Sequence, residues 1–183
     1  AFFTHNKNAQ TSINRSLLAT RSIVRKDTPA LWHFAYERYT DLWEQIQPVC
    51  FTIVRNPYDR VGSAFRYLKK IGKIPDDADL SAFVEDTLAR EGFGFDAHFM
   101  PQEKYTKPIR AMGFDFIIHF ENLERRWREM AVLIDAPAGL PHSNASGGGT
   151  NTAAMLSPDA RAVVETLYAG DFEGLGYTHH RPS

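Results

Sequence analysis

The side chains best placed for chemistry on an anion are an arginine and a serine, Arg55 and Ser63. Arg55 follows an apolar segment, residues 49–54, and Ser63 lies two turns into the helical pattern that comes next. Between them, Asn56 is typical of a helix N-cap and Pro57 of a first helical position. Backbone N–H groups and the helix dipole at such a strand–helix junction favour negative charge. We therefore expect an anion site here. The alternative is an ordinary strand–turn–helix in which the arginine pairs with an acidic side chain on the surface.

A second candidate anion site lies near the beginning of the chain. Residues 1–4 have the pattern of a buried strand, residues 5–10 form a polar loop, and Thr11 and Ser12 open a helical pattern. Loop N–H groups, the Lys7 ammonium and the two hydroxyls together form a donor set for phosphate. The loop contains no glycine and is not a Walker A sequence. The alternative is a helix capped by a hydroxyl residue, with Lys7 in solvent.

Strand-like and helical segments alternate along the chain. The strand-like segments are residues 1–4, 49–54 and 114–120, with the short aromatic segment 32–34 as a fourth candidate. The helical patterns are residues 11–25, 36–45, 57–71, 81–90, 123–134 and 157–168. This alternation predicts an α/β fold with a central parallel sheet between helices, in three layers α/β/α. A length of 183 residues without an internal repeat predicts a single domain, residues 1–183.

Two further segments are expected to be irregular, and the tail has a role of its own. Residues 96–102 are a polar and aromatic loop, and residues 137–152 are a flexible loop with three consecutive glycines. The tail, residues 171–177, is expected to fold back on the domain as an aromatic plug.

Composition excludes several classes of protein. Net charge is −1 and hydrophobic content is 43%, which is ordinary for a soluble globular protein and gives no reason to expect a nucleic-acid partner. The single cysteine, Cys50, is expected to be a buried core thiol in a reducing compartment, so we expect a cytoplasmic location. No segment has the pattern of a membrane span or of a metal site. The chain starts at Ala1 without Met, which leaves an upstream anchor open.

The two candidate anion sites together resemble those of the sulfotransferase superfamily, in particular the branch of carbohydrate and heparan-type O-sulfotransferases. Residues 55–63, RNPYDRVGS, match the family's 3′-phosphate motif R-[DN]-P-x-x-R-x-x-S at every fixed position. Residues 5–13, HNKNAQTSI, are similar to its 5′-phosphosulfate loop. Two further regions are more weakly similar to the family: the segments FDFI and FENL within residues 114–123, and the pairs DF and GY within residues 171–177. The resemblance spans nearly the whole chain.

This resemblance implies a P-loop NTPase-like fold and the donor 3′-phosphoadenosine 5′-phosphosulfate (PAPS). A sulfuryl group would pass to a hydroxyl acceptor, either a carbohydrate or a small molecule, and leave the 3′,5′-bisphosphate (PAP). Lys7 would stabilise the leaving phosphate, and no metal would be required. The residues implied in cofactor binding are Lys7, Asn8, Gln10, Thr11, Ser12, Arg55 and Ser63.

A general base should accept the acceptor's proton, and histidine suits this role because its reference pKa lies near 6.5. His33 is the first candidate, because it lies between the two anion sites and some family members place a histidine base in this region. The alternative is a histidine packed between Trp32 and Phe34. His98 is the second candidate, in a loop with Gln102 that could meet the acceptor.

The first loop departs from the family pattern, which usually has a proline before the lysine and a glycine shortly after it. Here Asn6 and the pair Ala9 and Gln10 occupy these places, so we expect looser backbone contact with the 5′-phosphate. Two alternatives stay open. One is a P-loop-like nucleotide kinase, which the missing Walker A glycines disfavour, and the other is a non-catalytic relative that binds a nucleotide or a partner. The sequence identifies neither the acceptor nor an oligomeric state.

Overall fold

The computed structural model describes residues 2–3, 51–110, 116–133, 135–140 and 151–180 of the chain. This part is a mixed α/β structure with a small parallel sheet and mostly helices. The strands are β1 (Phe2–Phe3), β2 (Phe51–Val54) and β3 (Phe116–His119), in the order β1-β2-β3. Both pairings are parallel, which confirms the parallel sheet for these strands. The predicted segment 32–34 and the predicted helices 11–25 and 36–45 lie outside the described residues.

Strand β2 runs through a two-residue turn into helix α3 (Pro57–Lys70), as the sequence predicts. The side chain of Asn56 accepts a hydrogen bond from the Tyr58 N–H at 3.0 Å, and Pro57 occupies the first turn. Asp59 lies in the same turn, where it complements the helix dipole. The helix ends before Gly72, whose φ of +73° favours glycine.

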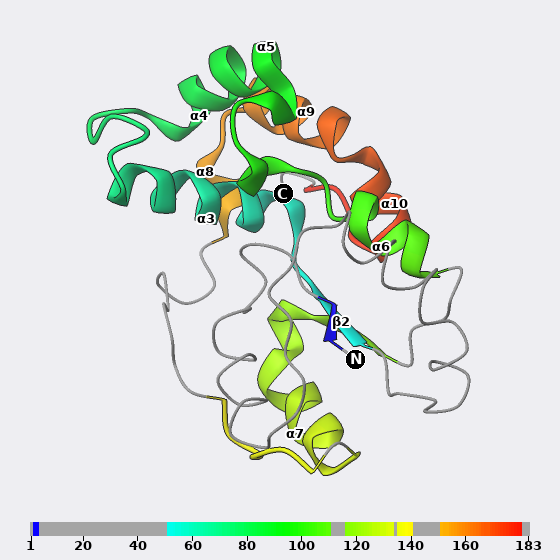
Figure 1. Cartoon of the computed structure of the whole chain (residues 1–183). Helices are drawn as coiled ribbons and strands as arrows, with labels where there is room; N and C mark the ends of the chain where they lie inside the picture. Colours follow the sequence, from blue (N-terminus) through cyan, green and yellow to red (C-terminus); the bar gives the residue numbers. More distant parts are fainter. Residues whose placement is uncertain (1, 4–50, 111–115, 134, 141–150, 181–183) are drawn as a thin grey trace, which may run out of the picture.

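Helices gather at the end of the sheet where β2 enters α3 (Figure 1). The run from residue 80 to 91 comprises α4 (Leu80–Ala82), the π-helix η1 (Phe83–Leu88) and α5 (Ala89–Glu91), which confirms the helix predicted there. The later members are α6 (Glu103–Arg110), α8 (Thr152–Met155), α9 (Pro158–Leu167) and α10 (Ala169–Leu175). Apolar side chains of η1, α8, α9 and α10 share one core with α3, in which Leu68, Val84, Phe99 and Val164 are fully buried.

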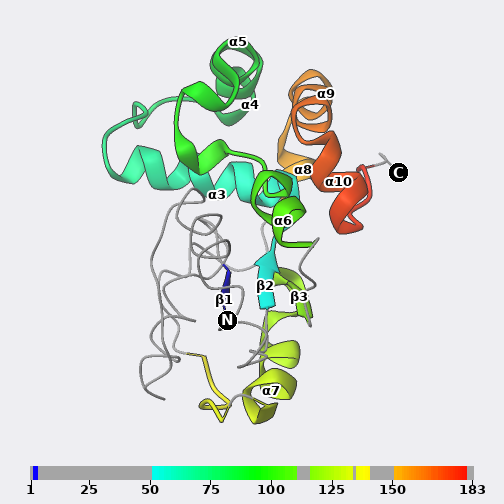
Figure 2. The ribbon, with the colours of Figure 1, turned by 45° about the vertical axis from the view of Figure 1, so that its right-hand side comes forward.

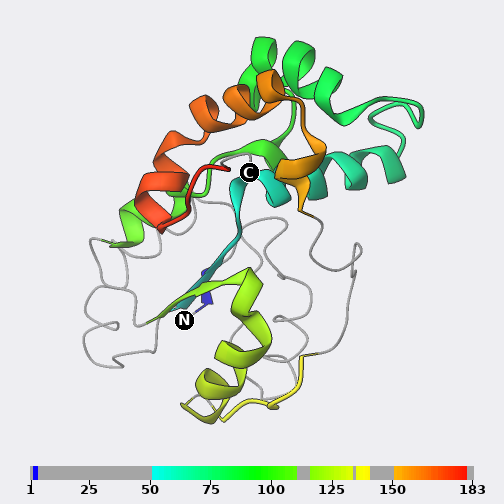
Figure 3. The same ribbon diagram turned by 180° about the vertical axis from the view of Figure 1, so that it is seen from behind.

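Helix α7 (Leu123–Leu133) packs on the sheet apart from the other described helices (Figures 2 and 3). Phe51, Ile53 and Ile118 point to it from the sheet, and a second core forms around Trp127. The alternation of Phe51 and Ile53 along β2 is that of a strand presenting one face. The Trp127 indole N–H donates to the Pro137 carbonyl at 2.9 Å, which fixes the turn after α7.

Two expectations about irregular segments were wrong in part. Residues 96–102 include a 3₁₀ turn, η3 (Ala97–Phe99), and are followed by α6, which the sequence did not predict. Residue 152, expected at the end of a flexible loop, begins α8. The tail, predicted to fold back on the domain, includes most of helix α10 with Phe172 buried, and Gly176, with a φ of +74°, ends that helix. The physical reason is that these helices are held by contacts from distant segments: the Asp171 carboxylate of α10, for example, accepts a hydrogen bond from the Glu103 N–H at the start of α6.

Candidate functional site

The turn between β2 and α3 carries the predicted anion-binding arginine. Arg55 is 6% exposed and Ser63 is 3% exposed, so both side chains lie inside the fold. The turn stands at the carboxyl end of a central parallel strand, which is where α/β sheets place their ligands. The N–H groups of Arg55, Asn56 and Tyr58 are each hydrogen-bonded within the protein and Pro57 has none, so the helix dipole rather than these groups favours an anion here.

Gln102 holds the backbone of Arg55 on both sides. The Arg55 N–H donates to Gln102 Oε1 at 2.9 Å, and Gln102 Nε2 donates to the Arg55 carbonyl at 2.8 Å. A side-chain amide thus takes the place of a neighbouring strand where the ladder of β2 stops. Gln102 is 1% exposed, so these hydrogen bonds are shielded from water.

Glu121 holds the next residue of the turn. The Asn56 N–H donates to Glu121 Oε1 at 2.8 Å, and the Tyr177 hydroxyl donates to Glu121 Oε2 at 3.0 Å. The Tyr177 ring lies 4.8 Å from the ring of His119 at the end of β3. Burial and the Glu121 carboxylate raise the pKa of Tyr177. The ends of β2 and β3 and the chain after α10 therefore meet at one place.

The Arg55 guanidinium lies over the Phe120 ring, 4.5 Å from its centroid. Burial lowers the pKa of Arg55. The carboxylates of Asp59 and Glu121 act to raise this pKa, and the Arg66 guanidinium acts to lower it. A bound anion stabilises a buried, poorly hydrated cation more than it stabilises a cation exposed to water. This surrounding is suited to a phosphate group.

The face of α3 that carries Ser63 is bordered by the start of α8. The Thr152 N–H donates to Asp59 Oδ1 at 3.0 Å. A Cβ atom at Gly62 would lie 2.7 Å from Thr152 Cγ2 and 3.2 Å from an Arg66 guanidinium nitrogen. The glycine thus permits a close approach of α8 to α3. Ser63, Asp59 and Arg66 share one helix face because they are spaced by three or four residues.

The second arginine of the motif, Arg60, faces the core. It is fully buried, and its Nη2 donates to the His98 carbonyl at 3.1 Å. Burial lowers the pKa of Arg60, while Tyr168 and Asp171 act to raise it. Arg60 therefore joins α3 to η3.

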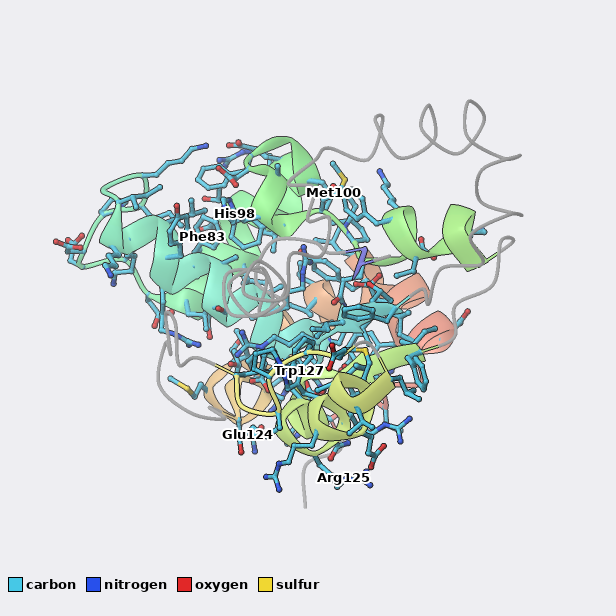
Figure 4. All side chains as sticks on the ribbon, turned by 60° about the horizontal axis from the view of Figure 1, so that its bottom comes forward. Phe83, His98, Met100, Glu124, Arg125 and Trp127 are labelled. Atoms are coloured by element: carbon cyan, nitrogen blue, oxygen red, sulfur yellow. The ribbon has the colours of Figure 1, made fainter. Side chains whose placement is uncertain are left out.

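His98 is half-buried beside α3, with its ring 4.9 Å from that of Tyr67, and it lies near Phe83 and far from Trp127 (Figure 4). Its Nδ1 is 2.6 Å from Asp96 Oδ1, and Lys73 Nζ is 2.6 Å from Asp96 Oδ2. Burial acts to raise the pKa of Asp96, but the hydrogen bonds from Lys73 and His98 outweigh it and hold that pKa at about 2.

The catalytic role of His98 stays a prediction. Gln102, which shares the predicted loop with His98, is buried against Arg55. The other predicted site residues, Lys7, Asn8, Gln10, Thr11, Ser12 and His33, lie outside the described residues. Among the residues that are described, no group of histidine, cysteine and acidic side chains could hold a metal ion. Within the same ranges, no helix has both the length and the apolar character needed to cross a membrane.

Sequence reasoning missed the three residues that hold the turn or its support, Gln102, Glu121 and Asp171. Glu121 lies in the segment FENL and Asp171 in the pair DF, which are both weakly similar to the family. That similarity marked these residues but did not indicate what they do. Their partners are far apart in the chain: Gln102 lies 47 residues from Arg55 and 69 residues from Asp171.

A family model described as the sulfotransferase family matches residues 5–178. Because this match covers nearly all of the 183 residues, the chain belongs to the sulfotransferase family. Searches of curated proteins and of solved structures gave no match.

Proposed function

We propose that this protein transfers a sulfuryl group from PAPS to a hydroxyl of an acceptor, either a carbohydrate or a small molecule. The observation that carries the proposal is the buried guanidinium of Arg55 at the entrance to α3, in a chain that belongs to the sulfotransferase family. A guanidinium beside the positive end of a helix dipole is suited to a phosphate dianion.

In this proposal Arg55 and Ser63 bind the 3′-phosphate of the nucleotide. The first loop binds the 5′ end, through Lys7, Asn8, Gln10, Thr11 and Ser12. Both groups follow parallel neighbouring strands, β1 and β2, whose carboxyl ends meet at one edge of the sheet. The whole chain then forms one domain with the three-layer, P-loop NTPase-like arrangement of the superfamily.

The transfer needs an in-line displacement at sulfur. The acceptor oxygen forms a bond to sulfur while the bond from sulfur to the bridging oxygen of the phosphosulfate breaks. His33, the first candidate base, takes the acceptor's proton, and Lys7 neutralises the charge that develops on the leaving phosphate. Positioning and electrostatic stabilisation supply the catalysis, as in phosphoryl transfer.

Calorimetric titration with PAP and, separately, with ATP–Mg²⁺ tests the proposal. We expect PAP to bind and ATP–Mg²⁺ to bind far more weakly. Binding of ATP–Mg²⁺ alone would favour a kinase, and binding of neither at millimolar concentration would refute both enzymes. A screen of acceptors with labelled PAPS then tests turnover, and PAP binding without transfer to any acceptor would favour a non-catalytic relative.

A further inference from the structure

Strand β2 leaves the sheet at Arg55, and from that residue its peptide groups need partners outside the sheet. The register of β2 with β3 ends at Val54, opposite His119. Buried N–H and carbonyl groups cost free energy unless they are hydrogen-bonded. Gln102 satisfies both groups of Arg55 with its own two polar atoms. The conformation of the Arg55 backbone is thus set by a side chain from another segment.

Gln102 is itself held in one orientation by Asp171. Asp171 Oδ2 accepts hydrogen bonds from the Gln102 main-chain N–H at 2.9 Å and from Gln102 Nε2 at 3.2 Å. Asp171 Oδ1 accepts from the Glu103 N–H at 2.7 Å, so the carboxylate caps the start of α6. Because Nε2 faces a carbonyl and a carboxylate while Oε1 faces an N–H, only one orientation of the amide satisfies all three partners.

We propose that Gln102, held by Asp171, is a positioning residue for the arginine that binds the 3′-phosphate. The inference rests on the proposed function. Gln102 is buried and acts through the Arg55 backbone, whose rotation moves the guanidinium at the far end of a long side chain. Small displacements of a charged group weaken both hydrogen-bond geometry and electrostatic attraction to a phosphate. Gln102 therefore determines how well the site distinguishes a nucleotide with a 3′-phosphate from one without it.

The test compares PAP with adenosine 5′-monophosphate, which differs from it only by the 3′-phosphate. Calorimetry on the full chain would measure both ligands with Gln102→Met, which removes both hydrogen bonds to Arg55. It would also use Gln102→Glu, which keeps the size and the Oε1 acceptor but turns a carboxylate oxygen toward the Arg55 carbonyl and Asp171 in place of Nε2. Circular dichroism first checks that each variant is folded. We expect the affinity for PAP to fall about tenfold or more, because about 1.4 kcal/mol is tenfold. The affinity for the monophosphate should stay within about twofold, since no 3′-phosphate contact is lost.

Thr106→Val is the matched control. Thr106 is buried one turn further along α6, and its hydroxyl donates to the Gln102 carbonyl at 3.2 Å. This variant perturbs the same helix without touching the hydrogen bonds to Arg55. We expect it to keep the preference for PAP, and a loss equal to that of Gln102→Met would overturn the inference.

A double-mutant cycle with Arg55→Ala separates positioning from general stability. If Gln102 acts through Arg55, adding Gln102→Met to Arg55→Ala should cost no further affinity for PAP. Additive losses, or equal weakening of PAP and the monophosphate, would overturn the inference. If wild-type protein prefers PAP and the Gln102 variants keep that preference, only the positioning role fails. If the wild-type protein itself shows no preference, the proposed function fails, and the inference falls with it.

Discussion

Replacing Asp171 by asparagine tests the buried support of the nucleotide turn. The carboxylate is fully buried and accepts three hydrogen bonds, from the Gln102 N–H, from Gln102 Nε2 and from the Glu103 N–H. Asparagine offers one oxygen, so its NH₂ group must face at least one of these donors. The better orientation keeps the oxygen toward Gln102 and turns the NH₂ group against the Glu103 N–H.

The expected loss follows from that geometry. A hydrogen bond to a charged acceptor contributes about 1.5–3 kcal/mol, and a buried donor left unpaired adds to the cost, so unfolding free energy should fall by about 2–3 kcal/mol. In a chain of this size the melting temperature should fall by roughly 5–10 °C. Urea unfolding monitored by circular dichroism measures the unfolding free energy of Asp171→Asn. The control is Glu173→Gln, a substitution at an exposed position of α10. If both variants lost the same small amount of unfolding free energy, the capping of α6 by Asp171 would be refuted.

Three further predictions concern the surroundings of the turn. Gly62→Ala should lower stability by about 1–2 kcal/mol in thermal unfolding, because its Cβ would lie 2.7 Å from buried Thr152 Cγ2. Since the folded-state pKa of Asp96 is lowered to about 2, its stabilising contribution is present above the unfolded pKa. It is lost as pH falls toward 2, so wild type and Asp96→Asn should converge in acid unfolding. Tyr177→Phe should cost about 1 kcal/mol in urea unfolding, because it removes the hydrogen bond to Glu121.

Each of these has a result that would contradict it. Gly94→Ala adds a Cβ in open space at a glycine without positive φ, and a loss equal to that of Gly62→Ala would exclude crowding as the cause. If the difference in unfolding free energy between wild type and Asp96→Asn stayed constant from neutral pH down to about pH 2, the predicted link between Asp96 protonation and stability would be refuted. If Tyr177→Phe were as stable as wild type, the hydroxyl would contribute nothing to holding the turn.

Elements fixed by near neighbours in the chain were predicted from the sequence. Asn56 and Pro57 begin α3 as expected, and the Ser157 hydroxyl accepts from the Ala160 N–H at 3.0 Å at the start of α9. In both cases the cap lies within three residues of the group that it satisfies, so the signal is local. The position of Arg55 followed from the same local pattern.

Elements held by distant residues were not predicted. The start of α6 is capped by Asp171, which lies 68 residues from Glu103. Helix α10 contains Gly170 and Gly174, and glycine has low helix propensity, so its pattern does not stand out locally. The role of Gln102 depends on the same long-range pairing. No local spacing shows that its amide reaches the peptide of Arg55.

Calorimetric titration of PAP into wild-type protein and into Arg55→Ala tests the central claim most directly. The account predicts that PAP binds wild type and that Arg55→Ala loses at least about tenfold in affinity, as expected when a buried charged contact to a phosphate is removed. The variant should remain folded by circular dichroism, so that the loss reports on binding. Equal affinity of PAP for both proteins would contradict the account, because the 3′-phosphate would then not be bound by Arg55.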